Sequence, residues 1–184
     1  MQGIVSTLDR EHNARIESLW SELEHTFGLK YACVAYPHFS YQVAESYAPG
    51  VDGALRALAA EARPFEVTTS GLGIFTGERP VLFIRVIRDA RLTAFHDAVA
   101  EAAAPYARGL HANHYSHEHW IPHITLAIED LTHDNLPDVI RLLSRRSFEW
   151  TITVDNVALV LDARGSRSDW VCLDFGKAAA PAQV

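Results

Sequence analysis

The sequence predicts an α+β fold in which two similar halves form pseudo-symmetric lobes around a central cleft. Three observations predict it. Hydrophobic residues alternate between a period of two and a period of 3.6 along the chain. A Pro-His-x-hydroxyl tetrapeptide occurs twice, and the same order of predicted elements follows each copy. The 184 residues are 48% hydrophobic and 21% charged, which fits a single globular domain with a shared core.

An N-terminal helix is predicted ahead of the first half, which contains most of the regular helical and strand patterns. A helix is predicted at about residues 8–27, because five apolar residues recur at helical spacing before Gly28, the expected C-cap; Ser6 or Thr7 is the expected N-cap. The elements predicted after it are strands at 31–35 and 38–45, a helix at 51–62, a hairpin of 65–75 with 81–87 about a turn at 76–80, and a helix at 91–104.

The second half begins with an irregular, histidine-rich stretch at 106–120. The predicted elements that follow are a strand at 123–129, a helix at 135–146, and strands at 148–161 and 170–175 about a turn at 162–169, with a frayed tail at 178–184. Pro137 lies in the first turn of the helix, where proline is tolerated. We therefore expect one domain over residues 1–184, with halves at about 31–105 and 115–176.

The two halves share sequence landmarks. Pro37-His38-Phe39-Ser40 and Pro122-His123-Ile124-Thr125 each open a predicted strand, and a helix follows each strand. Phe65-Glu66-Val67-Thr68 and Phe148-Glu149-Trp150-Thr151 then open the next long strand of their halves. This agreement in both residues and element order predicts an internal duplication of a strand–helix–strand–strand unit.

The repeated histidines and hydroxyls are candidate catalytic residues. Side chains alternate between the faces of a strand, so His38 and Ser40 (with Gln42) share one face, as His123 and Thr125 (with Ala127) do. The other faces, Phe39-Tyr41-Val43 and Ile124-Leu126-Ile128, are apolar and belong in the core. Two histidines facing each other across a cleft would supply an acid and a base at a phosphodiester near neutral pH. Ser40 and Thr125 would donate hydrogen bonds to its non-bridging oxygens.

At these residues the sequence resembles the 2H phosphoesterase superfamily, also called 2′-5′ RNA ligase-like or cyclic phosphodiesterase-like proteins. That family has one His-x-Thr/Ser motif in each half of a duplicated α+β fold, and here the resemblance covers about residues 31–175. The first motif departs from the usual pattern, with Ser40 for threonine and Tyr41-Gln42 after it. The resemblance implies action on 2′,3′-cyclic phosphates or 2′-5′ linkages of nucleotides or RNA ends, with ligation as the reverse reaction. It implies no metal or other cofactor.

Other residues near the second motif are candidates for substrate binding. Tyr115 and Trp120 could stack on a base, and Arg85 could hold a phosphate. The alternatives are packing for the aromatic residues and simple surface exposure for the arginine. His111, His114, His117 and His119 could form a zinc site, although their spacing matches no standard zinc pattern and cysteine is absent. A non-catalytic nucleotide- or RNA-binding module and a zinc hydrolase are therefore the competing functions.

The net charge of −7 argues against binding to an extended duplex, because contacts with phosphates require a basic surface. The expected partner is a small nucleotide or an RNA end, bound by a monomer. The first residues lack a signal-peptide pattern, and no apolar run is long enough to span a bilayer, so no membrane partner and a cytoplasmic location are expected. Cys33 and Cys172 lie in apolar runs and are expected to be buried, reduced thiols.

Overall fold

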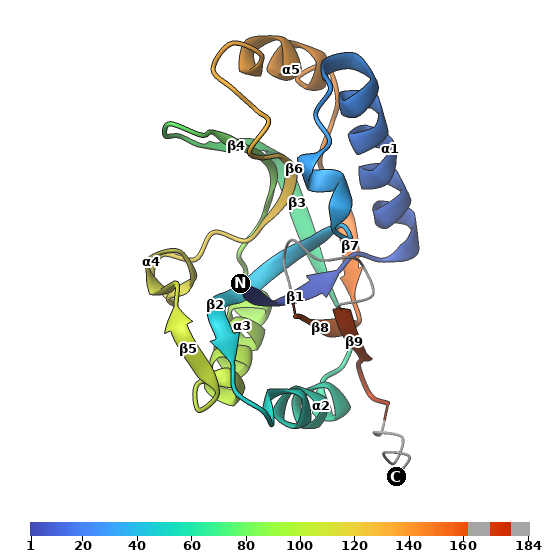
Figure 1. Ribbon diagram of the computed structural model, residues 1–184. Helices are drawn as coiled ribbons and strands as arrows, with labels where there is room; N and C mark the ends of the chain where they lie inside the picture. Colours follow the sequence, from blue (N-terminus) through green and yellow to red (C-terminus); the bar gives the residue numbers. More distant parts are fainter. Residues whose placement is uncertain (162–169, 178–184) are drawn as a thin grey trace.

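The computed structural model describes residues 1–161 and 170–177, which form two antiparallel sheets with helices packed against them (Figure 1). The strands are β1 (Gln2–Thr7), β2 (His38–Tyr47), β3 (Phe65–Phe75), β4 (Val81–Val86), β5 (Ala107–Leu110), β6 (His123–Ala127), β7 (Thr151–Val154), β8 (Asn156–Val160) and β9 (Trp170–Asp174). The helices are α1 (Arg10–Phe27), α2 (Val51–Glu61), α3 (Ala90–Ala103), α4 (Ala112–Tyr115) and α5 (Leu136–Leu143), with a 3-10 turn at Tyr31–Val34.

The two sheets exchange strands between the halves of the sequence. One sheet has the order β5-β2-β1-β8-β9 and the other the order β6-β4-β3-β7. The first histidine strand, β2, therefore shares a sheet with the β8–β9 hairpin of the second half. The second histidine strand, β6, pairs with β4 of the first half. The predicted α+β architecture is confirmed, but the ranges 31–105 and 115–176 describe the sequence repeat and not the two sheets.

The pairing of β3 with β7 relates the two repeats by an approximate twofold axis. Thr68 and Thr151 are the fourth residues of the two Phe-Glu-x-Thr segments, and they are direct partners in this ladder. In an antiparallel pair, equivalent residues meet only where a twofold axis passes between the strands. The register thus supports the internal duplication.

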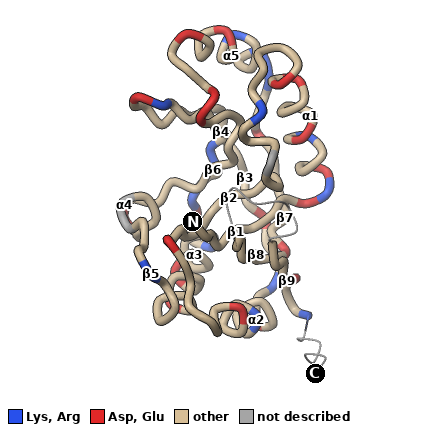
Figure 2. Tube along the Cα trace, in the orientation of Figure 1, with Lys and Arg blue, Asp and Glu red and all other residues tan. Residues whose placement is uncertain are grey.

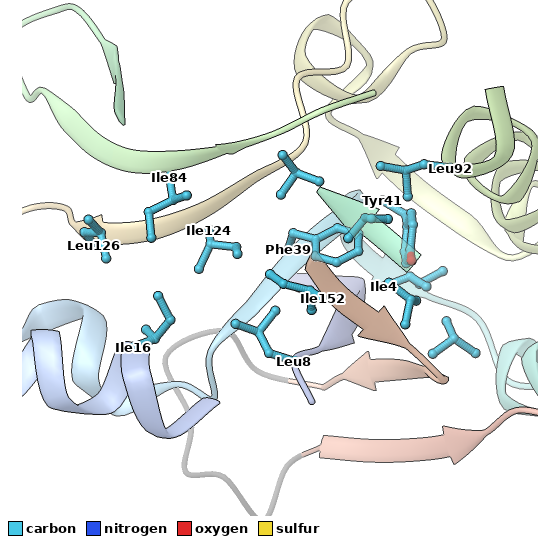
Figure 3. Packing of buried hydrophobic residues seen from close by; sticks show 14 of the residues in the cluster. Ile4, Leu8, Ile16, Phe39, Tyr41, Ile84, Leu92, Ile124, Leu126 and Ile152 are labelled. Carbon is cyan, nitrogen blue, oxygen red and sulfur yellow. The ribbon is translucent and has the colours of Figure 1, made fainter. Parts of the chain in front are cut away.

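The core lies on the apolar faces predicted for both histidine strands (Figure 3). Phe39 and Tyr41 of β2 are 1% and 0% exposed, and Ile124 and Leu126 of β6 are 0% and 1% exposed. Ile16 of α1 belongs to the same cluster. Burying a side chain of this size contributes about 1.5–3 kcal/mol, so both strands are anchored from behind.

The start of the chain differs from the prediction. The helix begins at Arg10, and its N-cap is Asp9, whose carboxylate accepts the His12 N–H at 3.0 Å. Ser6 and Thr7 are not caps, because they belong to β1, which lies between β2 and β8. The Ser6 hydroxyl instead donates to the Asn156 carbonyl at 2.5 Å. The predicted C-cap is confirmed, since Gly28 has the left-handed φ of 75°.

Four further predictions need correction. Residues 31–35 do not form a strand, because the chain makes the 3-10 turn there. The stretch 106–120 contains β5 and α4. The predicted strand 148–161 breaks at Asp155 into β7 and β8, which join different sheets. Cys172 is exposed and Cys33 is partly buried, and both are thiols; Cys172 faces outward because its neighbour Leu173 takes the buried face of β9.

The remaining helices and strands lie within a few residues of their predicted bounds. The turn at 162–169 and the tail at 178–184 lie outside the described residues. Within residues 1–161 and 170–177, none of the helices has the length and apolar character needed to cross a bilayer.

Candidate active site

His38 and His123 occupy equivalent positions, as the first residues of β2 and β6. The Nδ1 of His38 lies 2.6 Å from the carbonyl oxygen of Tyr36, and that of His123 lies 2.7 Å from the carbonyl oxygen of Ile121. A carbonyl only accepts hydrogen bonds, so Nδ1 must carry the proton in both rings. In the neutral imidazole this leaves Nε2 with a free lone pair. The same contact, two residues back, therefore fixes the same tautomer at both histidines.

The backbone around the two motifs has the same irregularity. The β1–β2 register shifts between Ser40 and Gln42, which makes Tyr41 an extra residue. The β4–β6 register shifts between Thr125 and Ala127, which makes Leu126 an extra residue. Each strand thus has a β-bulge directly after its hydroxyl residue, a feature that often re-aims side chains beside active sites. The bulge also ends the predicted alternation, because the next buried residues are Gln42 and Ala127 rather than Val43 and Ile128.

The two histidine strands lie against each other although they belong to different sheets. Burial lowers the pKa of His38, and the positive charge of His123 lowers it further, which places the two imidazoles within electrostatic reach. Burial also lowers the pKa of His123, and the charge of His114 adds to this effect. The structure therefore brings the two predicted catalytic histidines together and disfavours charge on both.

Aromatic rings surround each imidazole. Trp170 of β9 meets His38 edge-on, with ring centroids 5.2 Å apart. Phe75 and Phe83 of the β3–β4 hairpin meet His123 at 4.9 and 5.0 Å. Nothing in the sequence distinguishes these three residues from ordinary aromatic core positions on strands, so they are not predicted as site residues. They limit ring rotation and provide the apolar surroundings that lower the histidine pKa values.

Ser40 and Thr125 are half-buried and lie two residues after their histidines. Tyr115 of α4 reaches the first of them, and its hydroxyl hydrogen-bonds with that of Ser40. Burial raises the pKa of Tyr115. Its backbone is held by His96, whose Nε2 donates to the Tyr115 carbonyl at 3.0 Å. The structure thus brings Tyr115 together with the first motif.

Trp120 does not have the position predicted for it. Its side chain is buried, with 2% of the residue exposed, and His96 stacks on it with ring centroids 4.0 Å apart. Its Nε1 donates to the Ser40 carbonyl at 2.8 Å. With its face and its polar edge both occupied, this indole has no free surface for a base. The prediction that Trp120 stacks on substrate is wrong; the alternative of core packing holds.

Arg85 lies beside His123. The two are direct partners in the β4–β6 ladder, so their side chains project from the same face of the sheet. Arg85 is exposed, and no ion pair with it is found within the part of the chain that the structure describes. Two exposed apolar residues lie two positions further along the paired segments, Ile87 after Arg85 and Ile121 before His123. Arg85 is therefore available to an anion bound at His123.

The other histidines of the loop before β6 have separate partners. His117 contacts Asp97 at 2.7 Å, and His119 contacts the Ser116 hydroxyl at 3.0 Å. His114 is near His123, as its effect on that residue's pKa indicates. Among the described residues, no three His, Cys, Asp or Glu side chains lie close enough together to hold a metal ion.

A duplicated α+β fold that brings together two equivalent His-x-hydroxyl strands defines the two-histidine, or 2H, phosphoesterase class. The model of the 2′-5′ RNA ligase superfamily matches residues 8–166, and the chain belongs to that superfamily. The resemblance seen in the sequence is thereby confirmed.

Solved structures agree with this assignment at the level of the fold. TT0787 of Thermus thermophilus is 18% identical, with 94% of this chain and 93% of that chain covered and a TM-score of 0.56. E. coli LigT complexed with 3′-AMP is 16% identical, with 95% and 94% covered and a TM-score of 0.55. Kluyveromyces marxianus Usb1 is 12% identical, with 95% and 97% covered and a TM-score of 0.51. No curated protein matches the chain by sequence.

Proposed function

We propose that the protein is a phosphodiesterase that acts on 2′,3′-cyclic phosphates or 2′-5′ linkages of nucleotides or RNA ends. His38 and His123 are its acid–base pair. The observation that carries this proposal is the shared tautomer: both rings donate from Nδ1 to a backbone carbonyl and keep Nε2 for substrate. One ring can then take a proton while its charged counterpart gives one.

For hydrolysis of a cyclic phosphate, one Nε2 removes a proton from water as the water oxygen bonds to phosphorus. The other, protonated Nε2 gives its proton to the ribose oxygen as the P–O bond breaks. Ser40 and Thr125 donate to the non-bridging oxygens, where charge grows in the transition state. A 5′-hydroxyl in place of water gives ligation, because only the nucleophile differs.

The charge of the protein limits the substrate to a small group. Lysines and arginines are interspersed with acidic residues along the described chain (Figure 2), and the net charge is −7. A long duplex needs many phosphate contacts, whereas a nucleotide needs few. Arg85 beside His123 is the residue that we propose for a substrate phosphate. Crystal structures of E. coli LigT with 3′-AMP, ATP and NADP+ support a nucleotide as the ligand class.

The test is a turnover panel of 2′,3′-cyclic nucleotides, 2′-5′ dinucleotides and RNA ends. We expect product from at least one class, and none from the His38→Ala/His123→Ala double variant. Saturable binding without product from any member would instead identify a non-catalytic nucleotide-binding module.

A further inference from the structure

The geometry points to Trp20 and Trp120 as a pair of positioning residues: Trp20 of the N-terminal helix holds the catalytic strand of the second half, and Trp120 of the second half holds the catalytic strand of the first. This inference rests on the proposed function for its kinetic consequences. The structural part, a pair of indole–carbonyl hydrogen bonds at the two bulges, stands separately. Neither tryptophan touches the reacting atoms in this scheme.

The two hydrogen bonds are equivalent. Trp20 of α1 donates from Nε1 to the carbonyl of Thr125, at 3.2 Å, in the second motif. Trp120, just before β6, donates from Nε1 to the carbonyl of Ser40, at 2.8 Å, in the first motif. The carbonyl acceptor is in each case that of the hydroxyl residue. Both donors are buried, with 4% and 2% of the residue exposed.

Strand pairing explains why these two carbonyls need an outside donor. The Pro37 and Pro122 carbonyls accept N–H groups from the β1 and β4 sides. By antiparallel alternation, the carbonyls of Ser40 and Thr125 therefore point away from β1 and β4. On that other side β5 pairs with β2 only from Ala44 onward, and β6 is an edge strand. A carbonyl in the interior without a ladder partner must find another partner, because an unpaired one is costly. The indole N–H supplies it and so fixes the peptide unit that follows the hydroxyl residue. The orientation of that unit sets the direction of the Ser40 and Thr125 side chains.

An indole is suited to this task because its N–H lies on a large, rigid ring. His96 stacks on Trp120 at 4.0 Å, and Tyr41, the bulged residue itself, lies 5.8 Å away. On the other side, α1 packs against β6, the strand that carries Thr125. Each donor is thus immobilised by packing before it meets the carbonyl. A ring without the N–H would fill the same space but leave the peptide free to turn.

The experiment removes the N–H and keeps the ring, through Trp20→Phe and Trp120→Phe. We expect kcat to fall about three- to tenfold in each variant, the value of one hydrogen bond, with KM within about twofold. The matched control is Trp150→Phe. In the described part of the chain the Trp150 indole makes no hydrogen bond, although its ring is also packed. Its kcat should match that of wild type.

Double variants separate positioning from mere packing. In a Thr125→Ala background, Trp20→Phe should lower kcat no further, because the hydroxyl that it aims is gone; in a Ser40→Ala background it should keep its full effect. Trp120→Phe should behave in the opposite way. Losses that multiply in every combination would mean that the tryptophans act only through stability and would overturn the inference.

Two measurements keep the test decisive if a phenylalanine variant folds poorly or if the proposed function fails. Incorporating 3-benzothienylalanine, which has sulfur in place of the indole N–H, preserves the ring shape and should still reduce kcat. Independently of activity, the indole N–H signals of Trp20 and Trp120 should exchange with solvent much more slowly than that of Trp150. Fast exchange at both tryptophans would refute the two indole–carbonyl hydrogen bonds. Slow exchange in a protein without turnover would refute only the proposed function.

Discussion

The two histidine strands differ in what surrounds them more than in how they are built. Both β2 and β6 begin with the histidine, tie its Nδ1 to the carbonyl two residues back and bulge after the hydroxyl residue. Their cross-strand neighbours are unlike. Thr7 lies opposite His38 and donates to Asn156 Oδ1 at 3.1 Å, whereas Arg85 lies opposite His123 and is exposed.

The shared and the differing features suit two separate functions, catalysis and substrate recognition. Acid–base chemistry at phosphorus needs two equivalent groups, and the features that both strands share give the two imidazoles the same tautomer and the same orientation. Substrate recognition needs a direction, because the two sides of a phosphodiester carry different groups. Among the described residues, the cross-strand cation and the exposed Ile87 and Ile121 lie on the β6 side. We therefore expect the His123 side to bind the larger or more anionic part of the substrate.

The strongest test of equivalence is removal of each imidazole. His38→Ala and His123→Ala should each lower turnover by roughly 10²–10⁴, the usual contribution of a positioned acid or base. The double variant should lose less than the product of the two, because the residues act as a unit. Steady-state turnover of the best substrate measures this. Full activity of either single variant on all accepted substrates would break the two-histidine mechanism.

The hydroxyls should matter less than the imidazoles. Ser40→Ala and Thr125→Ala each remove one donor to a non-bridging oxygen and should cost on the order of 2–4 kcal/mol at most in transition-state stabilisation. Tyr115 hydrogen-bonds with Ser40 and has no equivalent at Thr125 among the described contacts, so the Ser40 variant can be partly compensated. The ratio of kcat values for the two variants reports this asymmetry. A larger loss at Ser40 than at Thr125 would show that the compensation is absent.

The sequence predicts the parts of this site that depend on local pattern. The two Pro-His-x-hydroxyl segments and the buried residues behind them follow from strand alternation, and the structure agrees as far as Tyr41 and Leu126, where the bulges end that alternation. The strand β1 could not be read in the same way, since its large apolar residues are only Ile4 and Val5. It becomes a strand because β2 and β8 lie on either side of it.

Other features depend on which distant segments meet. Trp20 and Trp120 look like core residues in the sequence, and only the fold shows that their N–H groups reach the bulge carbonyls. The bulges are also hidden, because Tyr41 and Leu126 are apolar and fit an unbroken strand. Asp155 separates two apolar runs that read as one strand, and long-range pairing alone assigns them to different sheets.

A glycine provides a test confined to the His123 side. A Cβ added at Gly73 would lie 2.3 Å from the Phe83 ring, which itself contacts His123, so the ring must move. We expect Gly73→Ala to lower kcat by about tenfold, or ~1.4 kcal/mol, while the protein stays folded. Gly53→Ala in α2 is the control, because apart from its own helix no described atom lies within 4 Å of its added Cβ; it should raise stability by about 0.5–1 kcal/mol. Unchanged turnover in the Gly73 variant would show that Phe83 does not position His123.

The pH dependence should place the optimum of the free enzyme on the acidic side of neutrality. Burial lowers the pKa of both histidines below the ordinary value of 6.5, so as pH rises the protonated acid is lost early. A plot of kcat/KM against pH should therefore be bell-shaped, and the loss of activity on its alkaline side should begin below pH 7. His114→Ala removes a positive charge near His123, raises the pKa of that histidine and should move one limb upward. A rate that rises steadily to pH 10 would favour a hydroxide nucleophile instead.

The smallest effect on turnover is expected from treatment with a metal chelator. The two-histidine scheme takes its acid, base and phosphate donors from the motifs, whereas a zinc hydrolase would use a metal-bound hydroxide and hold its histidines neutral as ligands. His117 contacts Asp97 and His119 contacts Ser116, so each of these histidines has its own hydrogen-bond partner within or next to the loop. Excess EDTA should leave turnover essentially intact. Replacing His111, His117 and His119 together by alanine should keep kcat within about tenfold, or ~1.4 kcal/mol. Loss of activity with EDTA and its restoration by zinc alone would contradict the mechanism, because neither motif could produce that pattern.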